Sequence, residues 1–68
     1  MDIPQSLQDL DLPSLIGRPV AEARHSVEDA GGIARLVAPG GVVTADYRSN
    51  RVTLIVDGDR VVGTTGIG

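Results

Sequence analysis

The sequence predicts an α+β domain in which one helix packs on a small mixed β-sheet and a long loop lies exposed between two strands. Three observations predict this fold class. Apolar residues recur at helical spacing over residues 19–30, they alternate with a period of two over residues 51–57, and residues 39–50 are too many for a tight turn. A helical segment followed by several strands is typical of a helix that covers one face of a sheet.

The composition limits how this chain of 68 residues can be stabilised and what it can bind. Cysteine is absent, which excludes disulfides and cysteine-based zinc sites, and Tyr47 is the sole aromatic residue. The net charge of −3 argues against a basic nucleic-acid interface, and no apolar run is long enough to cross a bilayer. We expect a monomer with no cofactor, metal, nucleic-acid or membrane partner.

The N-terminal residues show no clear periodicity. Residues 1–12 carry scattered apolar side chains and aspartates, and we expect a flexible arm ahead of a single domain over residues 13–68. Residues 13–17 predict a turn that places Leu15 and Ile16 in the core. A signal-peptide pattern is absent. We therefore expect either a cytoplasmic protein, or a secreted or periplasmic protein whose signal peptide has been removed.

The helix is predicted over residues 19–30. Its apolar stripe consists of Val20, Ala23, Val27 and Ala30. Gly31 and Gly32 predict its end, because glycine readily adopts the left-handed conformation that follows a helix. Pro19 suits the first turn, but no Ser, Thr, Asp or Asn directly precedes it, so the N-terminal cap is weak. His25 falls on the polar face and is predicted to be a surface residue.

Three strands are predicted, over residues 33–38, 51–57 and 60–65. In the second strand, alternate residues form two faces, with Val52 and Leu54 on one and Thr53 on the other. The Asp-Gly-Asp sequence at residues 57–59 predicts a hairpin turn between the last two strands. It lacks the further ligands and spacing of a calcium-binding loop.

The connection over residues 39–50 is the most unusual segment. Connections in compact domains are commonly about 4–6 residues long, and longer ones are often functional or disordered. This one differs in composition from a disordered linker, because Val42, Val43 and Tyr47 stand beside hydrogen-bonding and charged residues. Apolar residues on an exposed loop suggest a surface that is presented to a partner.

The same connection carries a recognisable motif. Residues 42–52 read Val-Val-Thr-Ala-Asp-Tyr-Arg-Ser-Asn-Arg-Val and run into a hydrophobic strand. Upstream, Leu-Ile-Gly-Arg at residues 15–18 is followed by Val20, Glu22, Ala23 and Arg24. Together these motifs resemble the potato inhibitor I family of serine protease inhibitors over roughly residues 12–68. The pattern of loop and second strand is specific, whereas the helix alone is a weak signal.

This resemblance implies a tight-binding inhibitor that enters a serine protease as a substrate would. The reactive bond would join Ala45 and Asp46, with Ala45 in the primary specificity pocket. The protease-binding residues on the two sides of that bond would be Val42, Val43, Thr44, Asp46, Tyr47 and Arg48. A loop that is held rigid binds with little ordering cost, whereas a flexible peptide of the same sequence is cleaved and lost.

The chemistry of the flanking residues suggests how the loop is held without a disulfide. Thr44 and Asp46 offer oxygen acceptors beside the proposed bond, and Arg51 at the base of the loop offers a fork of donors. Arg48 is a further candidate brace, or a direct contact to the protease. The alternatives are that Arg51 is a solvated strand-edge residue and that Tyr47 covers the edge of the core.

Two departures from the family bear on potency. Positions where members of the family often carry a second and a third bracing arginine hold Thr53 and Gly66 here. A softer loop would favour a non-inhibitory protein-binding module on the same scaffold. The small side chain of Ala45 leaves a large specificity pocket partly empty, so we expect subtilisin-like or elastase-like targets. An enzyme is not expected, because Cys is absent and the single His lies on the polar helix face.

Overall fold

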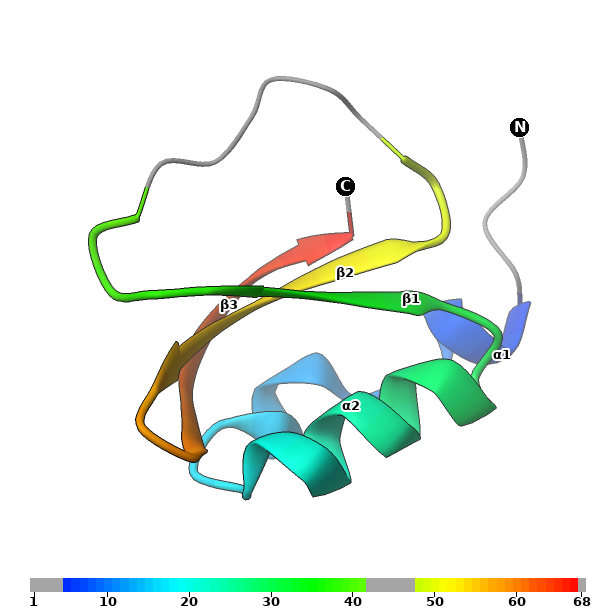
Figure 1. The fold of residues 1–68 in the computed structure, drawn as a ribbon. Helices are drawn as coiled ribbons and strands as arrows, with labels where there is room; N and C mark the ends of the chain where they lie inside the picture. Colours follow the sequence, from blue (N-terminus) through cyan, green and yellow to red (C-terminus); the bar gives the residue numbers. More distant parts are fainter. Residues whose placement is uncertain (1–4, 42–47, 68) are drawn as a thin grey trace.

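The computed structural model describes residues 5–41 and 48–67 as three helical segments on one face of a three-stranded sheet (Figure 1). In chain order the elements are α1 (Gln5–Gln8), the 3₁₀ helix η1 (Leu12–Leu15), α2 (Val20–Asp29), β1 (Ile33–Val37), β2 (Arg51–Asp57) and β3 (Arg60–Ile67). The α+β class predicted from the sequence is confirmed, with one main helix and a mixed sheet.

The strands lie in the order β1-β2-β3, so β2 is central. β1 runs parallel to β2, with Ile33 opposite Arg51 and Val37 opposite Ile55, and β3 runs antiparallel to β2. The hairpin between β2 and β3 turns at Gly58, whose φ of 65° together with a following non-glycine residue of negative φ fits a type II′ turn.

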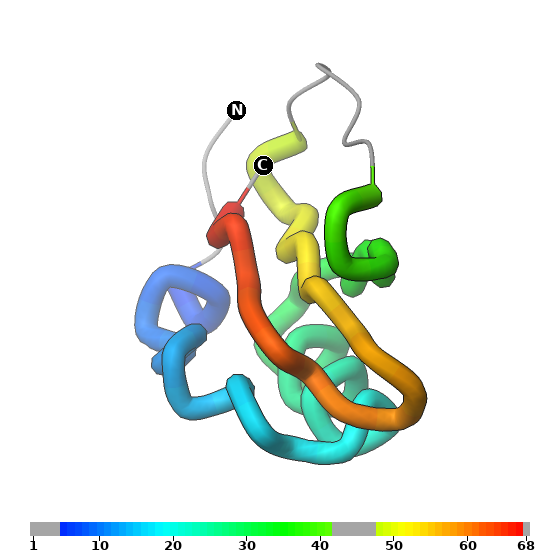
Figure 2. Tube along the Cα trace, turned by 90° about the vertical axis from the view of Figure 1, so that its left-hand side faces the viewer, coloured from blue at the N-terminus to red at the C-terminus, as the bar shows by residue number. Residues whose placement is uncertain are grey.

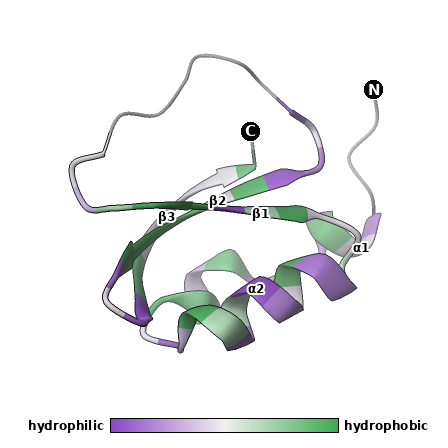
Figure 3. Ribbon diagram, viewed as in Figure 1, coloured by the Kyte–Doolittle hydropathy of each residue, from purple (hydrophilic) through white to green (hydrophobic). Residues whose placement is uncertain are grey.

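The core lies between the sheet and the helical segments. Figure 3 shows hydrophobic colouring along most of the sheet, whereas α2 is largely hydrophilic with shorter apolar stretches. The buried apolar residues are Leu7, Leu15, Ala23, Val27, Ala30, Val52, Leu54 and Val61. Because side chains alternate along a strand, Val52 and Leu54 facing this core place Arg51 and Thr53 on the opposite face of β2.

The N-terminal segment differs from the flexible arm that its composition predicts. Within the described part, α1 lies against the core, and the Leu7 side chain is only 1% exposed. The Ser6 hydroxyl donates a hydrogen bond of 2.6 Å to the carbonyl of Ala30 at the end of α2. A single leucine without periodic neighbours gives no signal in the sequence, yet its burial adds a large side chain to a small core.

The ends of α2 are satisfied in two different ways. At its C-terminus, Gly31 has a φ of 89° and the amide of Gly32 donates to the carbonyl of Val27 at 3.0 Å, which is the Schellman arrangement that the paired glycines predict. At its N-terminus, Pro19 is the cap and has no side-chain bond. The amide of Val20 donates instead to the carbonyl of Asp59 at 2.7 Å, so the hairpin turn replaces the missing cap.

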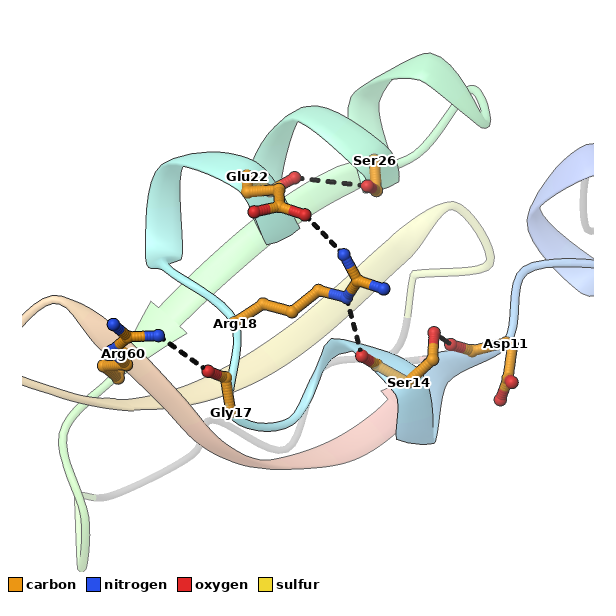
Figure 4. Close-up of polar contacts among 7 residues, drawn as sticks. All are labelled: Asp11, Ser14, Gly17, Arg18, Glu22, Ser26 and Arg60. Carbon is orange, nitrogen blue, oxygen red and sulfur yellow. Dashed lines mark hydrogen bonds and ion pairs between the residues drawn. The ribbon is translucent and has the colours of Figure 1, made fainter.

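Arginine side chains join the same helix end to the neighbouring segments (Figure 4). Arg18 Nε donates to the carbonyl of Ser14 at 2.9 Å, and its Nη1 contacts the carboxylate of Glu22 in the first turn of α2. Arg60 Nη1 donates to the carbonyl of Gly17 at 3.0 Å. These contacts are exposed, so they orient η1, α2 and β3 more than they stabilise them.

Candidate functional site

The connection between β1 and β2 is long for a topological reason. Parallel neighbours need a crossover of about a dozen residues, because the chain must return to the starting end of the sheet. Here 13 residues, 38–50, join Val37 to Arg51. The return along β1 covers about 13 Å, whereas 13 extended residues reach about 45 Å. Length alone is therefore no sign of function, but the excess reach allows the connection to stand away from the sheet.

The start of this connection is a hydrogen-bonded turn. The amide of Gly41 donates to the carbonyl of Ala38 at 2.9 Å. Pro39 at the second position and Gly40 with a φ of 74° at the third are the residues that a type II turn favours. A Cβ on Gly41 would lie 2.9 Å from the Ala38 oxygen, so this position also requires glycine. The turn sets the direction in which the chain leaves β1.

The end of the connection is a second turn. The amide of Arg51 donates to the carbonyl of Arg48 at 3.3 Å, and Asn50 accepts a bond of 2.7 Å from the amide of Ile33. This last bond ties the end of the connection to the first residue of β1. Figures 1 and 2 show both flanks on the side of the sheet away from α2, near opposite ends of β1.

The predicted site residues divide into two groups. Val42, Val43, Thr44, Ala45, Asp46 and Tyr47 lie outside the described residues, so their roles stay predictions. Arg48 is exposed in the second turn. Arg51 begins the central strand and is only 9% exposed, which removes the alternative of a solvated strand-edge arginine. A buried arginine at the base of the connection is consistent with the bracing role expected of it.

The two positions expected to lack a brace are cross-strand partners. Thr53 lies opposite Gly66, where the pairing of β2 with β3 is irregular. Gly66 has a φ of 88°, a conformation that arginine would adopt only with strain. Thr64 bridges the irregularity, because its hydroxyl donates to the carbonyl of Thr53 at 2.7 Å and accepts from the amide of Gly66 at 3.1 Å. The backbone path of β3 thus explains why glycine occupies this position.

One charged residue on this face was not singled out from the sequence. Arg35 lies at the centre of β1, directly opposite Thr53, and is half-buried. It therefore shares a face with Arg51, on the side of the sheet away from the core. The signal available in the sequence was an arginine inside the otherwise apolar run Ile-Ala-Arg-Leu-Val.

Other kinds of site find little support in the part of the chain that the structure describes. Across residues 5–41 and 48–67, no three His, Cys, Asp or Glu side chains are grouped so that they could hold a metal ion. The helices in these same ranges are too short or too polar to cross a membrane. His25 is exposed on α2, with its Nδ1 lying 3.4 Å from a carboxylate oxygen of Asp29.

Comparison with known proteins identifies the class to which these features belong. The family model described as the peptidase inhibitor I78 family matches residues 8–65. The chain belongs to the peptidase inhibitor I78 family. It is also similar to the subtilisin inhibitor CLSI-I of Canavalia lineata, with 43% identity over 58 residues, which cover 82% of this chain and 89% of that protein.

Membership of the I78 family confirms the prediction of a peptidase inhibitor at the level of the class. The finer likeness to the potato inhibitor I family stays a prediction. The family match spans η1, α2, β1, β2 and the whole connection between β1 and β2, and it ends at Thr65 within β3. The elements that anchor the two flanking turns therefore lie inside the matched region.

Proposed function

We propose that this protein inhibits a subtilisin-like or elastase-like serine protease by presenting residues 42–48 as a substrate-like segment, in the manner of the potato inhibitor I family. The reactive bond is that between Ala45 and Asp46. One observation carries the proposal: turns that end at Gly41 and begin at Arg48 anchor both sides of this segment to the same sheet.

This anchoring supports an inhibitory mechanism in which cleavage is reversible. When the protease serine attacks the bond, an acyl-enzyme forms and the amine is freed, and the acyl side remains attached to β1 through the first turn. The amine side remains attached to β2 and, through Asn50, to Ile33. The two new ends are thus tethered to a single sheet, so the amine stays near the acyl group and religation competes with release. A free peptide would lose its leaving side at this step.

The braces of the proposed segment come from the base of the connection. Arg51 is buried at the start of the central strand, on the face of the sheet away from the core. Its guanidinium has donors suited to the Thr44 hydroxyl and the Asp46 carboxylate, the two acceptors that flank the proposed bond. Arg48 is exposed at the edge of the second turn, and we expect it either to add to this network or to contact the protease.

The choice of target rests on the small residue at the specificity position and on the similar protein from Canavalia, which is named a subtilisin inhibitor. A large apolar pocket gains about 1–3 kcal/mol from a side chain that fills it, and Ala45 forgoes that gain. Pockets that accept small residues lose less. Subtilisin is therefore the first protease to test, with pancreatic elastase second.

The direct test is a titration of subtilisin, elastase, chymotrypsin and trypsin with the protein, followed by mass analysis of the inhibitor. We expect slow, tight inhibition of subtilisin or elastase and a single cleavage between Ala45 and Asp46. Rapid cleavage at several sites, with no protease inhibited, would contradict the proposal. Binding to a protease without inhibition would instead support a non-inhibitory module.

The assigned bond has its own test. Replacing Ala45→Leu should strengthen inhibition of chymotrypsin by about 10–100-fold, because the larger side chain fills its pocket. The matched control is Ala21→Leu, at an exposed position on α2, which should leave all four inhibition constants unchanged. An unaltered chymotrypsin constant for Ala45→Leu would show that another bond is the reactive one.

A further inference from the structure

Arg35 is placed unusually for a charged residue in so small a protein. It occupies the third of the five positions of β1, and its neighbours Ala34 and Leu36 lie on the opposite face of the strand. It is half-buried, although it lies on the face opposite Ala34, which packs against the core. No carboxylate among the described residues forms an ion pair with it.

Arg35 carries one of the few buried polar side-chain atoms that lack a partner in the described part of the chain. Three buried side-chain atoms have no hydrogen-bond partner within residues 5–41 and 48–67, namely Arg35 Nη1, Ser49 Oγ and Thr53 Oγ1. Thr53 is the direct register partner of Arg35, and Ser49 belongs to the turn that leads into β2. Buried polar groups are rarely left without partners, because each costs free energy. The unpartnered Arg35 Nη1 can only donate, so it calls for an acceptor oxygen on this face of the sheet.

Arg35 also lies beside the arginine already assigned as a brace. Ile33 pairs with Arg51 and Arg35 pairs with Thr53, so the two arginines are diagonal neighbours on one face of adjacent parallel strands. Guanidinium groups at diagonal positions of one face repel each other unless anionic or carbonyl oxygens lie between or above them. The described flanks of the connection, residues 38–41 and 48–50, lie on the side of the sheet away from α2, and Asp46 is the only acidic residue of the connection.

We propose that Arg35 is a positioning residue for the inhibitory segment, a second guanidinium brace supplied by β1 instead of by the Thr53 or Gly66 positions. This rests on the proposed function. The planar fork of Arg35 donates to oxygens of the segment from the side of β1, while Arg51 donates from β2. Donors from two strands restrain the segment against rotation, which a single donor residue would allow. Arg35 therefore keeps the reactive bond in place without touching the protease.

The experiment compares three variants of the full chain: Arg35→Met, Arg35→Lys and Arg24→Met. Methionine keeps much of the apolar stem but removes every donor, and lysine keeps the charge without the fork. Arg24→Met removes the same charge from an exposed position on α2 and is the matched control. For Arg35→Met we expect about tenfold weaker inhibition of subtilisin and about tenfold faster cleavage of the segment. Arg35→Lys should recover part of both losses.

A second measurement does not depend on inhibition. Amide hydrogen exchange at Gly41 and Arg51 reports opening of the two turns, and exchange at Val52 and Leu54 reports opening of the sheet. Arg35→Met should raise the exchange rates of the turn amides and leave those of the sheet amides unchanged.

The inference is overturned if Arg35→Met and Arg24→Met give the same exchange rates at the turns. It is also overturned if Arg35→Met raises the exchange rates of the sheet amides as much as those of the turns, as a purely structural role would require. If the wild-type chain inhibits no protease while the turns respond as expected, the proposed function fails and the positioning role stands.

Discussion

Replacing Gly32→Ala tests how closely the N-terminal helix, α2 and the end of the connection pack together. A Cβ at this position would lie 2.8 Å from Leu7 Cδ1, 3.1 Å from Val27 Cγ1 and 3.1 Å from the carbonyl oxygen of Asn50. The Asn50 oxygen cannot retreat freely, because it accepts the amide of Ile33 at 2.7 Å. The added methyl group must therefore displace the two apolar side chains, or it must strain the hydrogen bond between the Ile33 amide and the Asn50 carbonyl.

The expected cost follows from the number of fixed neighbours. Overpacking a filled core costs about 1–3 kcal/mol. A domain of this size has a free energy of unfolding of about 3–10 kcal/mol, so the substitution removes a large share of it. The midpoint of thermal unfolding should fall by about 5–20 °C.

Thermal unfolding followed by circular dichroism measures this effect, with Gly63→Ala as the control. A Cβ on Gly63 would meet only the Ile55 side chain, at the ordinary contact distance of 3.6 Å, so that variant should unfold near the wild-type temperature. Adding Leu7→Val to Gly32→Ala should return part of the lost stability by opening space. If Gly32→Ala unfolds at the same temperature as Gly63→Ala, the three-way packing at Gly32 is wrong.

Three further predictions concern the packing of the N-terminal segment and the path of β3. Leu7→Ala should lower the free energy of unfolding by about 2–5 kcal/mol in a urea titration, because the Leu7 side chain is fully buried. The control is Leu36→Ala at a more exposed position, and an equal or smaller cost for Leu7→Ala would contradict the place of Leu7 in the core. Thr64→Val should cost about 1–3 kcal/mol through the loss of two hydrogen bonds, whereas Thr65→Val, at an exposed neighbour, should be nearly neutral in the same titration. Gly66→Ala should lower the free energy of unfolding by about 1–2 kcal/mol, because Gly66 has a positive φ, and Gly66→Asn should lower it less. Equal unfolding temperatures for the wild type and both variants would show that a side chain at this position causes no strain.

The regular elements were predictable because their signals are local. The apolar stripe and the paired glycines predict a helix that the structure has at Val20–Asp29, and the strand patterns agree with β1, β2 and β3 to within a few residues. The packing of Leu7 was not predictable, since it depends on a space between α2 and Gly32 that exists only in the folded chain. The cap of α2 was also hidden, because its acceptor at Asp59 lies 39 positions further along the sequence.

The connection shows a similar division. Its composition predicts a presented segment, and its motif resembles that of a protease inhibitor. The parallel pairing of β1 with β2, which explains its length, cannot be derived from strand patterns, because either direction buries the same alternate residues. The sequence likewise could not show that Arg35 and Arg51, 16 positions apart, become diagonal neighbours.

By itself, then, the sequence determined the fold class, the positions of the helix and strands, the absence of disulfides and the class of peptidase inhibitor. The physical reason is that periodicity, turn residues and motifs act over a few neighbouring positions. Only the tertiary structure decided strand direction, the capping of α2 by the hairpin, and which arginines share the face of the sheet away from the core. Those outcomes depend on long-range pairing, which places donors and acceptors from distant parts of the chain within hydrogen-bond distance.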